Sequence, residues 1–231
     1  MTTALLFSFF GGILPAFLWL KFWLHEAPHH EPRRIIFGIF VFGMMSVFLA
    51  GILEQAISQF VVEYSLLSLF LWAMVEELLK YIGARNIGIK SRFCDNPIDP
   101  VIFLTTSALG FAAAENILFL FDPISNGDFI LSLSTLSARF VGATVLHVIA
   151  SGCIGIFIGF SLHKSQHTKK IFALCGFLLA TLLHTAFNRF IIQDERYVVW
   201  VFLAVWLGLI LVVYILERIK KHKKLFLITK Q

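Results

Sequence analysis

The sequence predicts an all-α membrane protein, a polytopic bundle of about seven transmembrane helices. Hydrophobic residues make up 58% of the 231 residues, charged residues make up only 14%, and the mean hydropathy is +0.85. Soluble domains are typically about 45–50% apolar and about 25% charged. The apolar residues also fall in successive runs of about 20, which is the length needed to cross a hydrocarbon core of about 30 Å. Residues 1–231 are therefore expected to form a single transmembrane domain.

Seven runs have this length, and each is expected to form one helix. The first run has no basic residue before it and no small-residue cleavage site after it, so we expect it to remain as a helix and not to be a signal peptide. The third run differs from the others because it carries Glu76, Glu77 and Lys80. The runs cover approximately residues 4–24, 34–54, 64–85, 100–121, 138–162, 170–191 and 197–216.

Basic residues predict the orientation of the bundle. Lysines and arginines gather in the first, third and fifth loops and in the tail at residues 217–231, whereas the second and fourth loops have none. Since positively charged loops stay in the cytoplasm, we expect the N-terminus outside and the tail inside a bacterial plasma (inner) membrane. The net charge of +5 then reflects topology and contact with anionic lipid, and nucleic acid is not an expected partner.

Polar residues inside four consecutive runs are the main functional signal. An ionisable group at mid-membrane costs at least about 2.5–3.5 kcal/mol, so each needs a reason to be there. Counting the helical rise from the loop charges places all of them at one level, slightly outside the midplane. Such a concentration of polarity exceeds what helix packing needs and indicates a water-filled pocket. The residues are Glu76, Glu77, Lys80, Glu115, Asn116, His147, His184 and Asn188.

Helical spacing limits what the charged residues of the third run can do. Lys80 follows Glu76 by four residues and Glu77 by three, so its ammonium group can reach either carboxylate. The two glutamates lie about 100° apart around the helix axis. One is expected to face the pocket and the other to pair with Lys80 or a neighbouring helix, and the sequence leaves both assignments open.

Several classes of protein use such a pocket. A hydrolase would take a proton from attacking water with a carboxylate, while an imidazole or carboxamide stabilises the oxyanion. A metal-dependent membrane hydrolase would use the same glutamates and histidines as ligands. A non-catalytic membrane scaffold and a proton-coupled transporter are further alternatives, although the discontinuous helices and internal symmetry typical of transporters are not clearly visible.

Four motifs, taken in order, resemble the PrsW family of intramembrane proteases. They are E-E-x-x-K at 76–80, F-x-x-x-E at 111–115, a histidine followed eight residues later by glycine at 147–155, and H-x-x-x-N at 184–188. That family is related to the CAAX prenyl endopeptidases, called CPBP or Abi proteins in bacteria, and more distantly to the Aph subunit of gamma-secretase. The CAAX enzymes have a histidine where this chain has Glu115, which favours PrsW. The resemblance covers roughly residues 64–192, the expected catalytic core.

The resemblance implies a glutamic-type peptidase without a cofactor, and a divalent metal stays open as the alternative. Glu76 or Glu77 would activate water, and His147 would act as an acid or position the water. Glu115 would complete the polar cluster, and Lys80 would hold the glutamate pair. His184 and Asn188 would line the site and form the oxyanion hole. The implied partner is a membrane protein or peptide, such as a single-span anti-sigma factor that is cut near the outer face in regulated proteolysis.

Residues 128–162 are too long for one straight span, because 35 residues in a helix would extend about 52 Å. We expect residues 128–137 to form an interfacial or partly re-entrant piece near the outer mouth of the pocket. In that place the piece would serve as a lid or substrate gate. The simpler alternative is a helical extension outside the membrane.

Overall fold

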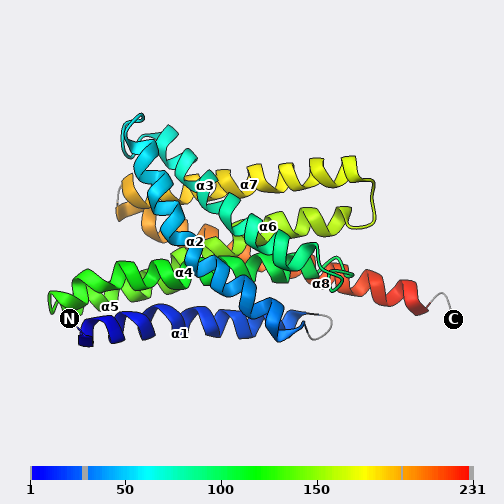
Figure 1. Cartoon of the computed structure of the whole chain (residues 1–231), viewed down its shortest axis with the longest axis horizontal. Coiled ribbons are helices and arrows are strands. Elements are labelled where there is room, and N and C mark those ends of the chain that lie inside the picture. Colours follow the sequence, from blue (N-terminus) through cyan, green and yellow to red (C-terminus); the bar gives the residue numbers. More distant parts are fainter. Residues whose placement is uncertain (1, 28–30, 194, 229–231) are drawn as a thin grey trace.

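A computed structural model describes residues 2–27, 31–193 and 195–228, and within these residues the chain is helical without strands (Figure 1). The predicted all-α bundle is thereby confirmed. The last three residues of the predicted basic tail, 229–231, lie outside the described residues. The elements are α1 (Thr2–Glu26), α2 (Arg33–Ser58), α3 (Leu66–Ala84), η1 (Arg85–Ile89), α4 (Asp99–Ser125), α5 (Phe129–Ala138), η2 (Arg139–Ala143), α6 (Thr144–Ser161), α7 (Gln166–Gln193), η3 (Glu195–Tyr197) and α8 (Val198–Ile228).

Every one of the seven predicted runs corresponds to a helix. Six helical segments are long and apolar enough to cross a membrane, namely α1, α2, α4, the continuous α5–α6 segment, α7 and α8. The remaining long helix, α3, has 19 residues and differs from these six in carrying three charged residues, Glu76, Glu77 and Lys80, in its interior. The start of α1 and the end of α8 lie at opposite ends of the molecule (Figure 1), as an odd number of crossings requires. Which end faces the cytoplasm stays a prediction.

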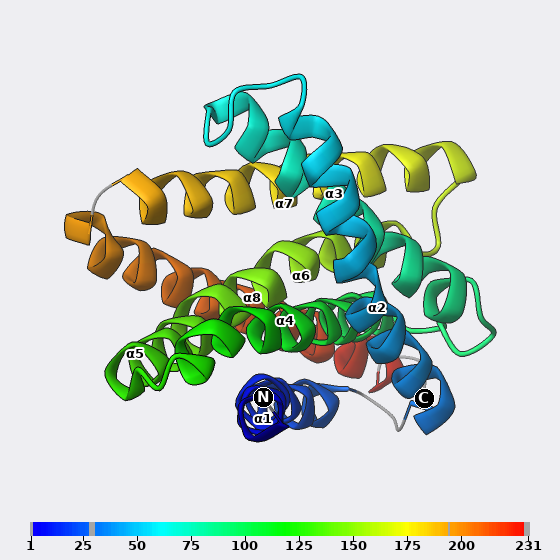
Figure 2. The same ribbon diagram turned by 60° about the vertical axis from the view of Figure 1, so that its left-hand side comes forward.

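Helix α4 is the centre of the bundle. It packs against α1, α2, α3 and α6, and the two ribbon views show it enclosed by them (Figures 1 and 2). Glycine allows the closest of these contacts, because a Cβ atom on Gly110 would collide with the carbonyl oxygen of Phe40 in α2. Small residues at helix crossings are typical of membrane bundles. Buried α4 is therefore a rigid support for the side chains that it carries.

The long segment at residues 128–162 is a continuous helix with one irregular turn. Helix α5, the π-helical turn η2 and α6 follow one another without a break. No residue of α5 is buried, and α5 packs mainly on α4 and η2. Residues 129–138 thus extend α6 as a helix without a chain reversal, and their place inside, at or outside the membrane stays a prediction. A role of this extension as a gate stays a prediction.

Candidate active site

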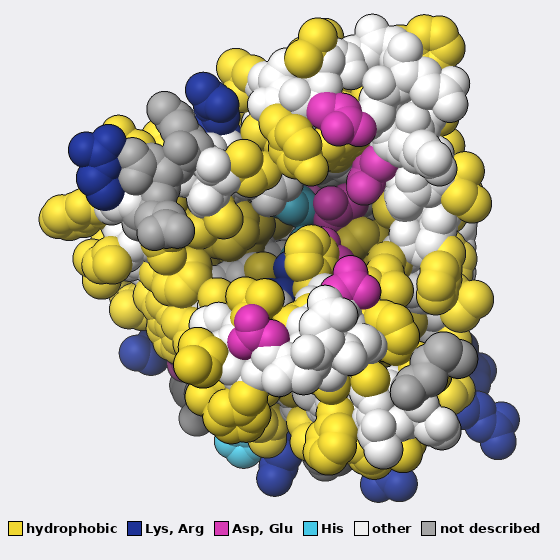
Figure 3. All heavy atoms as spheres, turned by 90° about the vertical axis from the view of Figure 1, so that its left-hand side faces the viewer, with side chains coloured by type: hydrophobic (Ala, Val, Ile, Leu, Met, Phe, Trp, Pro, Cys, Tyr) yellow, Lys and Arg dark blue, Asp and Glu magenta, His cyan; other side chains and the backbone are white. Residues whose placement is uncertain are grey.

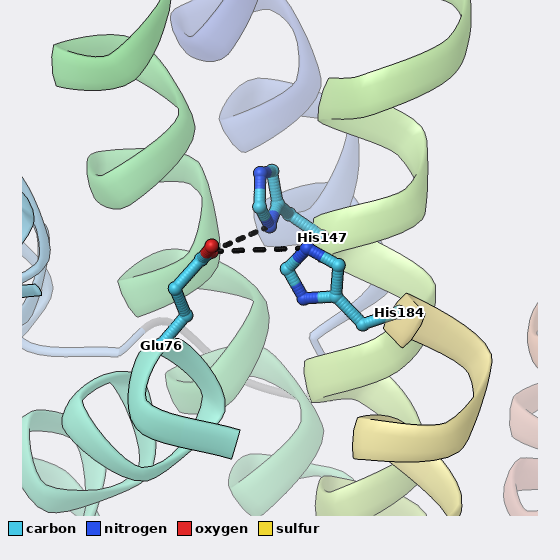
Figure 4. Close-up of side chains that lie close together, drawn as sticks. All are labelled: Glu76, His147 and His184. Carbon is cyan, nitrogen blue, oxygen red and sulfur yellow. Dashed lines mark ion pairs between the residues drawn. The ribbon is translucent and has the colours of Figure 1, made fainter. Parts of the chain in front are cut away.

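Four helices bring most of the predicted polar residues together. Helix α3 contributes Glu76, Glu77 and Lys80, and its partners come from α4, α6 and α7. In Figure 4, Glu76, His147 and His184 point toward one another from three different helices. Burial is nearly complete, since these three side chains have residue exposures of 7%, 2% and 2%. The predicted convergence at one depth therefore produces direct contact.

Lys80 is the hub of the cluster. Its Nζ atom lies 2.7 Å from Glu77 Oε1, 3.4 Å from Glu76 Oε2 and 2.8 Å from His147 Nδ1, and the side chain is fully buried. The ring of Phe111 covers the same ammonium group at 4.4 Å. An ammonium group has three donors and no acceptor. His147 Nδ1 therefore accepts a hydrogen bond from Lys80, and the proton of the neutral imidazole is on Nε2.

The adjacent glutamates have different surroundings. Glu77 is fully buried and accepts from three side chains, because His184 Nδ1 lies 3.0 Å from its Oε1 and Ser151 Oγ donates to its Oε2 at 2.8 Å, in addition to the bond from Lys80. Glu76 has one hydrogen bond within the described residues, the long one from Lys80. Glu77 is thus an anchor between helices, and Glu76 faces the pocket. The geometry favours one of the two assignments that the sequence left open.

Three electron-pair donors converge beside Glu76. His184 donates its Nδ1 proton to Glu77, which leaves Nε2 as an acceptor 3.8 Å from Glu76 Oε2. His147 donates its Nε2 proton to Glu115 Oε2 at 2.9 Å, which leaves Nδ1 as an acceptor 4.0 Å from Glu76 Oε2. The three atoms lie within 4.8 Å of one another. Glu76 Oε2 and His184 Nε2 are placed to accept hydrogen bonds from a water molecule, and the three atoms together would coordinate a divalent cation once Lys80 released His147 Nδ1.

Sequence reasoning missed Arg139, which it counted only as a charge near the outer end of a span. Its Nη2 donates to Glu115 Oε2 and its Nε donates to Asn116 Oδ1, both at 2.5 Å. The amide of buried Asn116 in turn donates to Thr144 Oγ1 at 3.1 Å. Arg139 lies at the first position of the π-helical turn η2. No sequence pattern predicted this turn, so the spacing gave no signal for Arg139.

The cluster opens toward one end of the molecule. Figure 3 views the left-hand end of Figure 1 and shows a hollow with acidic and histidine side chains inside it, surrounded by apolar ones. Glu54 of α2, half-buried, interacts electrostatically with Glu76 and Glu115. Sequence analysis passed over Glu54 because it is the last residue of its predicted span. The hollow thus exposes acidic and histidine side chains at this end of the molecule.

Asn188 lies apart from the hydrogen-bonded cluster. It is half-buried, one turn beyond His184 on α7. Among the residues that the structure describes, no hydrogen bond joins it to the other site residues. Its predicted part in an oxyanion hole stays a prediction.

Comparisons with known proteins identify the family of the chain. A family model described as PrsW family intramembrane metalloprotease matches residues 31–216. Protease PrsW of Oceanobacillus iheyensis is 30% identical over 186 residues, 77% of this chain and 80% of that protein. Protease PrsW of Geobacillus kaustophilus is 26% identical over 193 residues, 81% and 80% of the two chains. Protease PrsW of Clostridioides difficile is 24% identical over 216 residues, 90% and 85% of the two chains. No solved structure matches the chain significantly.

Proposed function

The chain belongs to the PrsW family of intramembrane metalloproteases, and we propose that it activates water with Glu76 to cleave a membrane-protein substrate. It is a multi-pass membrane protein and a protease, and its substrate lies within the bilayer. The observation that carries the proposal is the difference between the two neighbouring glutamates. Glu77 is held by three donors from three helices, whereas Glu76 is turned toward the pocket.

The proposed reaction uses the atoms that surround Glu76. Water, held by one hydrogen bond to His184 Nε2 and one to Glu76 Oε2, loses the proton that it shares with Glu76 as its oxygen attacks the peptide carbonyl carbon. The negative charge on the carbonyl oxygen is then stabilised by a hydrogen bond from the amide of Asn188, a role we assign to this residue, and by the positive charge of nearby Lys80. When the C–N bond breaks, Glu76 returns its proton to the amine. His184 thus positions the water, and His147 holds Lys80 and Glu115 in place beside it.

A divalent metal is the second candidate for activating water, and one observation favours it. The donor set of two histidines and one carboxylate is one used by catalytic zinc, and Glu76, His147 and His184 supply it. Each histidine also donates its other ring proton to a carboxylate, Glu77 or Glu115, as ligating histidines usually do. These residues fit an ion, which would act as a Lewis acid on water and carbonyl. In this candidate Glu76 would be a ligand and not the base.

A reconstitution experiment tests the proposal and separates the two candidates. The full chain is purified into liposomes with single-span reporter proteins, and cleavage is followed with and without a chelator. Cleavage that survives the chelator supports Glu76 as the base. Cleavage that is lost with the chelator and restored by zinc supports the metal. If none of a broad reporter panel is cut, while Protease PrsW of Oceanobacillus iheyensis cuts it in the same liposomes, the proposal fails.

We further propose that the substrate is a single-span protein, for example an anti-sigma factor, cut near the outer face of the bacterial plasma membrane. The hollow in Figure 3 supports this, because it lies at the end of the molecule that the basic loops predict to be outside. Reporters labelled on both sides of the membrane would give the position of the cut. A cut on the cytoplasmic side would contradict this part of the proposal.

A further inference from the structure

We propose that Arg139 is a positioning residue for this reaction, acting through Glu115 on the orientation of His147. The inference rests on the peptidase function proposed above. Arg139 is outside the four motifs, and it does not touch the atoms proposed to hold water. Its side chain is only 12% exposed, which is unusual for an arginine near the end of a membrane helix, because long basic side chains there normally extend to the interface.

Three contacts fix the guanidinium group of Arg139. Nη2 donates to Glu115 Oε2 and Nε donates to Asn116 Oδ1, so the group holds two neighbouring side chains of α4. The guanidinium carbon also lies 4.1 Å from the centre of the Phe119 ring, one turn further along α4. A planar group held at both edges and on one face has little freedom. Arg139 therefore fixes Glu115 relative to the rigid centre of the bundle.

The π-helical turn brings Arg139 to the same helix face as His147. The two residues are eight positions apart, which in a regular α-helix separates side chains by about 80° around the axis. A π-helical turn takes up one extra residue, so eight positions correspond to about seven regular steps and leave a separation of only about 20°. Because η2 lies between them, both side chains can reach Glu115. Wide turns of this kind often occur at functional sites.

Helix α8 supports the wide turn from the other side. The indole Nε1 of Trp206 donates to the carbonyl oxygen of Val141 inside η2, at 3.1 Å. Gly142 leaves room for Phe202 of α8, whose ring a Cβ atom would strike. Both contacts fall within the five residues of η2. The turn is thus packed in place, and the position of Arg139 follows from it.

Arg139 affects His147 because both side chains bond to the same oxygen of Glu115. Glu115 Oε2 accepts from both Arg139 and His147 Nε2, so the carboxylate that Arg139 holds is the one that keeps the imidazole proton on Nε2. Without Arg139, Glu115 would face Glu54 and Glu76 with less positive charge nearby, and repulsion would turn it away. His147 would then lose the acceptor that fixes the orientation of its ring.

The first test is a double-mutant cycle on cleavage in liposomes. Arg139→Gln is expected to lower kcat about 10–100-fold, the usual effect of losing a partner behind a functional histidine, with KM nearly unchanged. In a Glu115→Gln background the same substitution should cost less than about twofold, because Arg139 acts through Glu115. Arg139→Lys should recover part of the activity, since lysine keeps the charge and loses the two-pronged contact. Arg218→Gln is the matched control, because Arg218 also covers an aromatic ring, that of Tyr214, away from the site.

The second test needs no substrate, so its result stands even if the proposed function fails. Nitrogen NMR of histidine-labelled protein reports which ring nitrogen of His147 carries the proton, and the His147 signal is the one missing from His147→Gln. The proton should be on Nε2 in the unaltered chain and in Arg218→Gln, and the signal of this nitrogen should shift in Arg139→Gln, because its acceptor Glu115 is displaced. An unchanged His147 signal in folded Arg139→Gln overturns the inference. The inference is also overturned if Arg139→Gln lowers cleavage as much in the Glu115→Gln background as in the unaltered chain.

Discussion

The molecule buries carboxylates in two regions, and only one of them has the composition of an active site. In the cluster between α3, α4, α6 and α7, Lys80 and Arg139 bring positive charge to three glutamates, and two imidazoles lie among them. At the opposite end of the molecule, Glu31 is buried beside Asp99, where the segment before α2 meets the start of α4.

The region around Glu31 and Asp99 mainly stabilises the connections before α2 and α4. Asp99 accepts backbone N–H groups of Asp95 and Asn96 at 3.0 and 2.7 Å, which closes the turn before α4. Burial, together with the charge of Asp99, raises the pKa of Glu31 to about 8. In its neutral form Glu31 shares a hydrogen bond with the carboxylate of Asp99. Burial of acidic groups alone is therefore weak support for catalysis, whereas carboxylates that share cations and imidazoles indicate a reaction centre.

Lys80→Met should have the largest effect on cleavage and stability. A small effect would contradict the distinction drawn between the two buried acidic regions. It removes the donor shared by Glu76, Glu77 and His147, so we expect loss of cleavage and a decrease of about 3–5 kcal/mol in stability, the usual cost of breaking a buried ion pair. Thermal unfolding in detergent measures the second effect. The double variant Lys80→Met, Glu77→Gln should recover part of the stability and none of the activity. Full cleavage by Lys80→Met would show that the cluster is no reaction centre.

Much of this cluster was predictable because helical rise is independent of packing. A residue's depth follows from counting about 1.5 Å per residue, and depth alone brought Glu115, His147 and His184 to one level. The choice between Glu76 and Glu77 was not predictable, because it depends on contacts from α6 and α7 that a single helix does not contain. Arg139 was missed because the π-helical turn changes the angular spacing without changing the sequence pattern.

Ser151→Ala should have an intermediate effect on stability, and it tests whether Glu77 anchors the neighbouring helices. Loss of the 2.8 Å bond to Glu77 Oε2 is expected to cost about 1.5–3 kcal/mol of stability, the range for hydrogen bonds to charged groups, and to slow cleavage only moderately. Ser134→Ala is the control, because Ser134 bonds only to its own exposed helix. Equal melting temperatures for the two variants would contradict the anchor role.

Glu31→Gln should have the smallest effect, confined to stability and dependent on pH. Because the pKa of Glu31 is raised from about 4.5 to about 8, the folded state binds more protons than the unfolded state between these values, and stability falls as pH rises. The variant does not titrate, so its advantage in melting temperature should grow from pH 5 to pH 8. Its cleavage rate should equal that of the unaltered chain. Exposed Glu63→Gln is the control and should show no such trend.

The most direct test of the account compares Glu76→Gln with Glu77→Gln in the same liposomes, measuring both melting temperature and cleavage of one reporter. Glu76→Gln should melt like the unaltered chain and cleave about 10²–10⁴-fold more slowly, the contribution expected of a general base. Glu77→Gln should melt at a clearly lower temperature, because three donors lose a charged acceptor. Cleavage by Glu76→Gln at the unaltered rate would contradict the central claim.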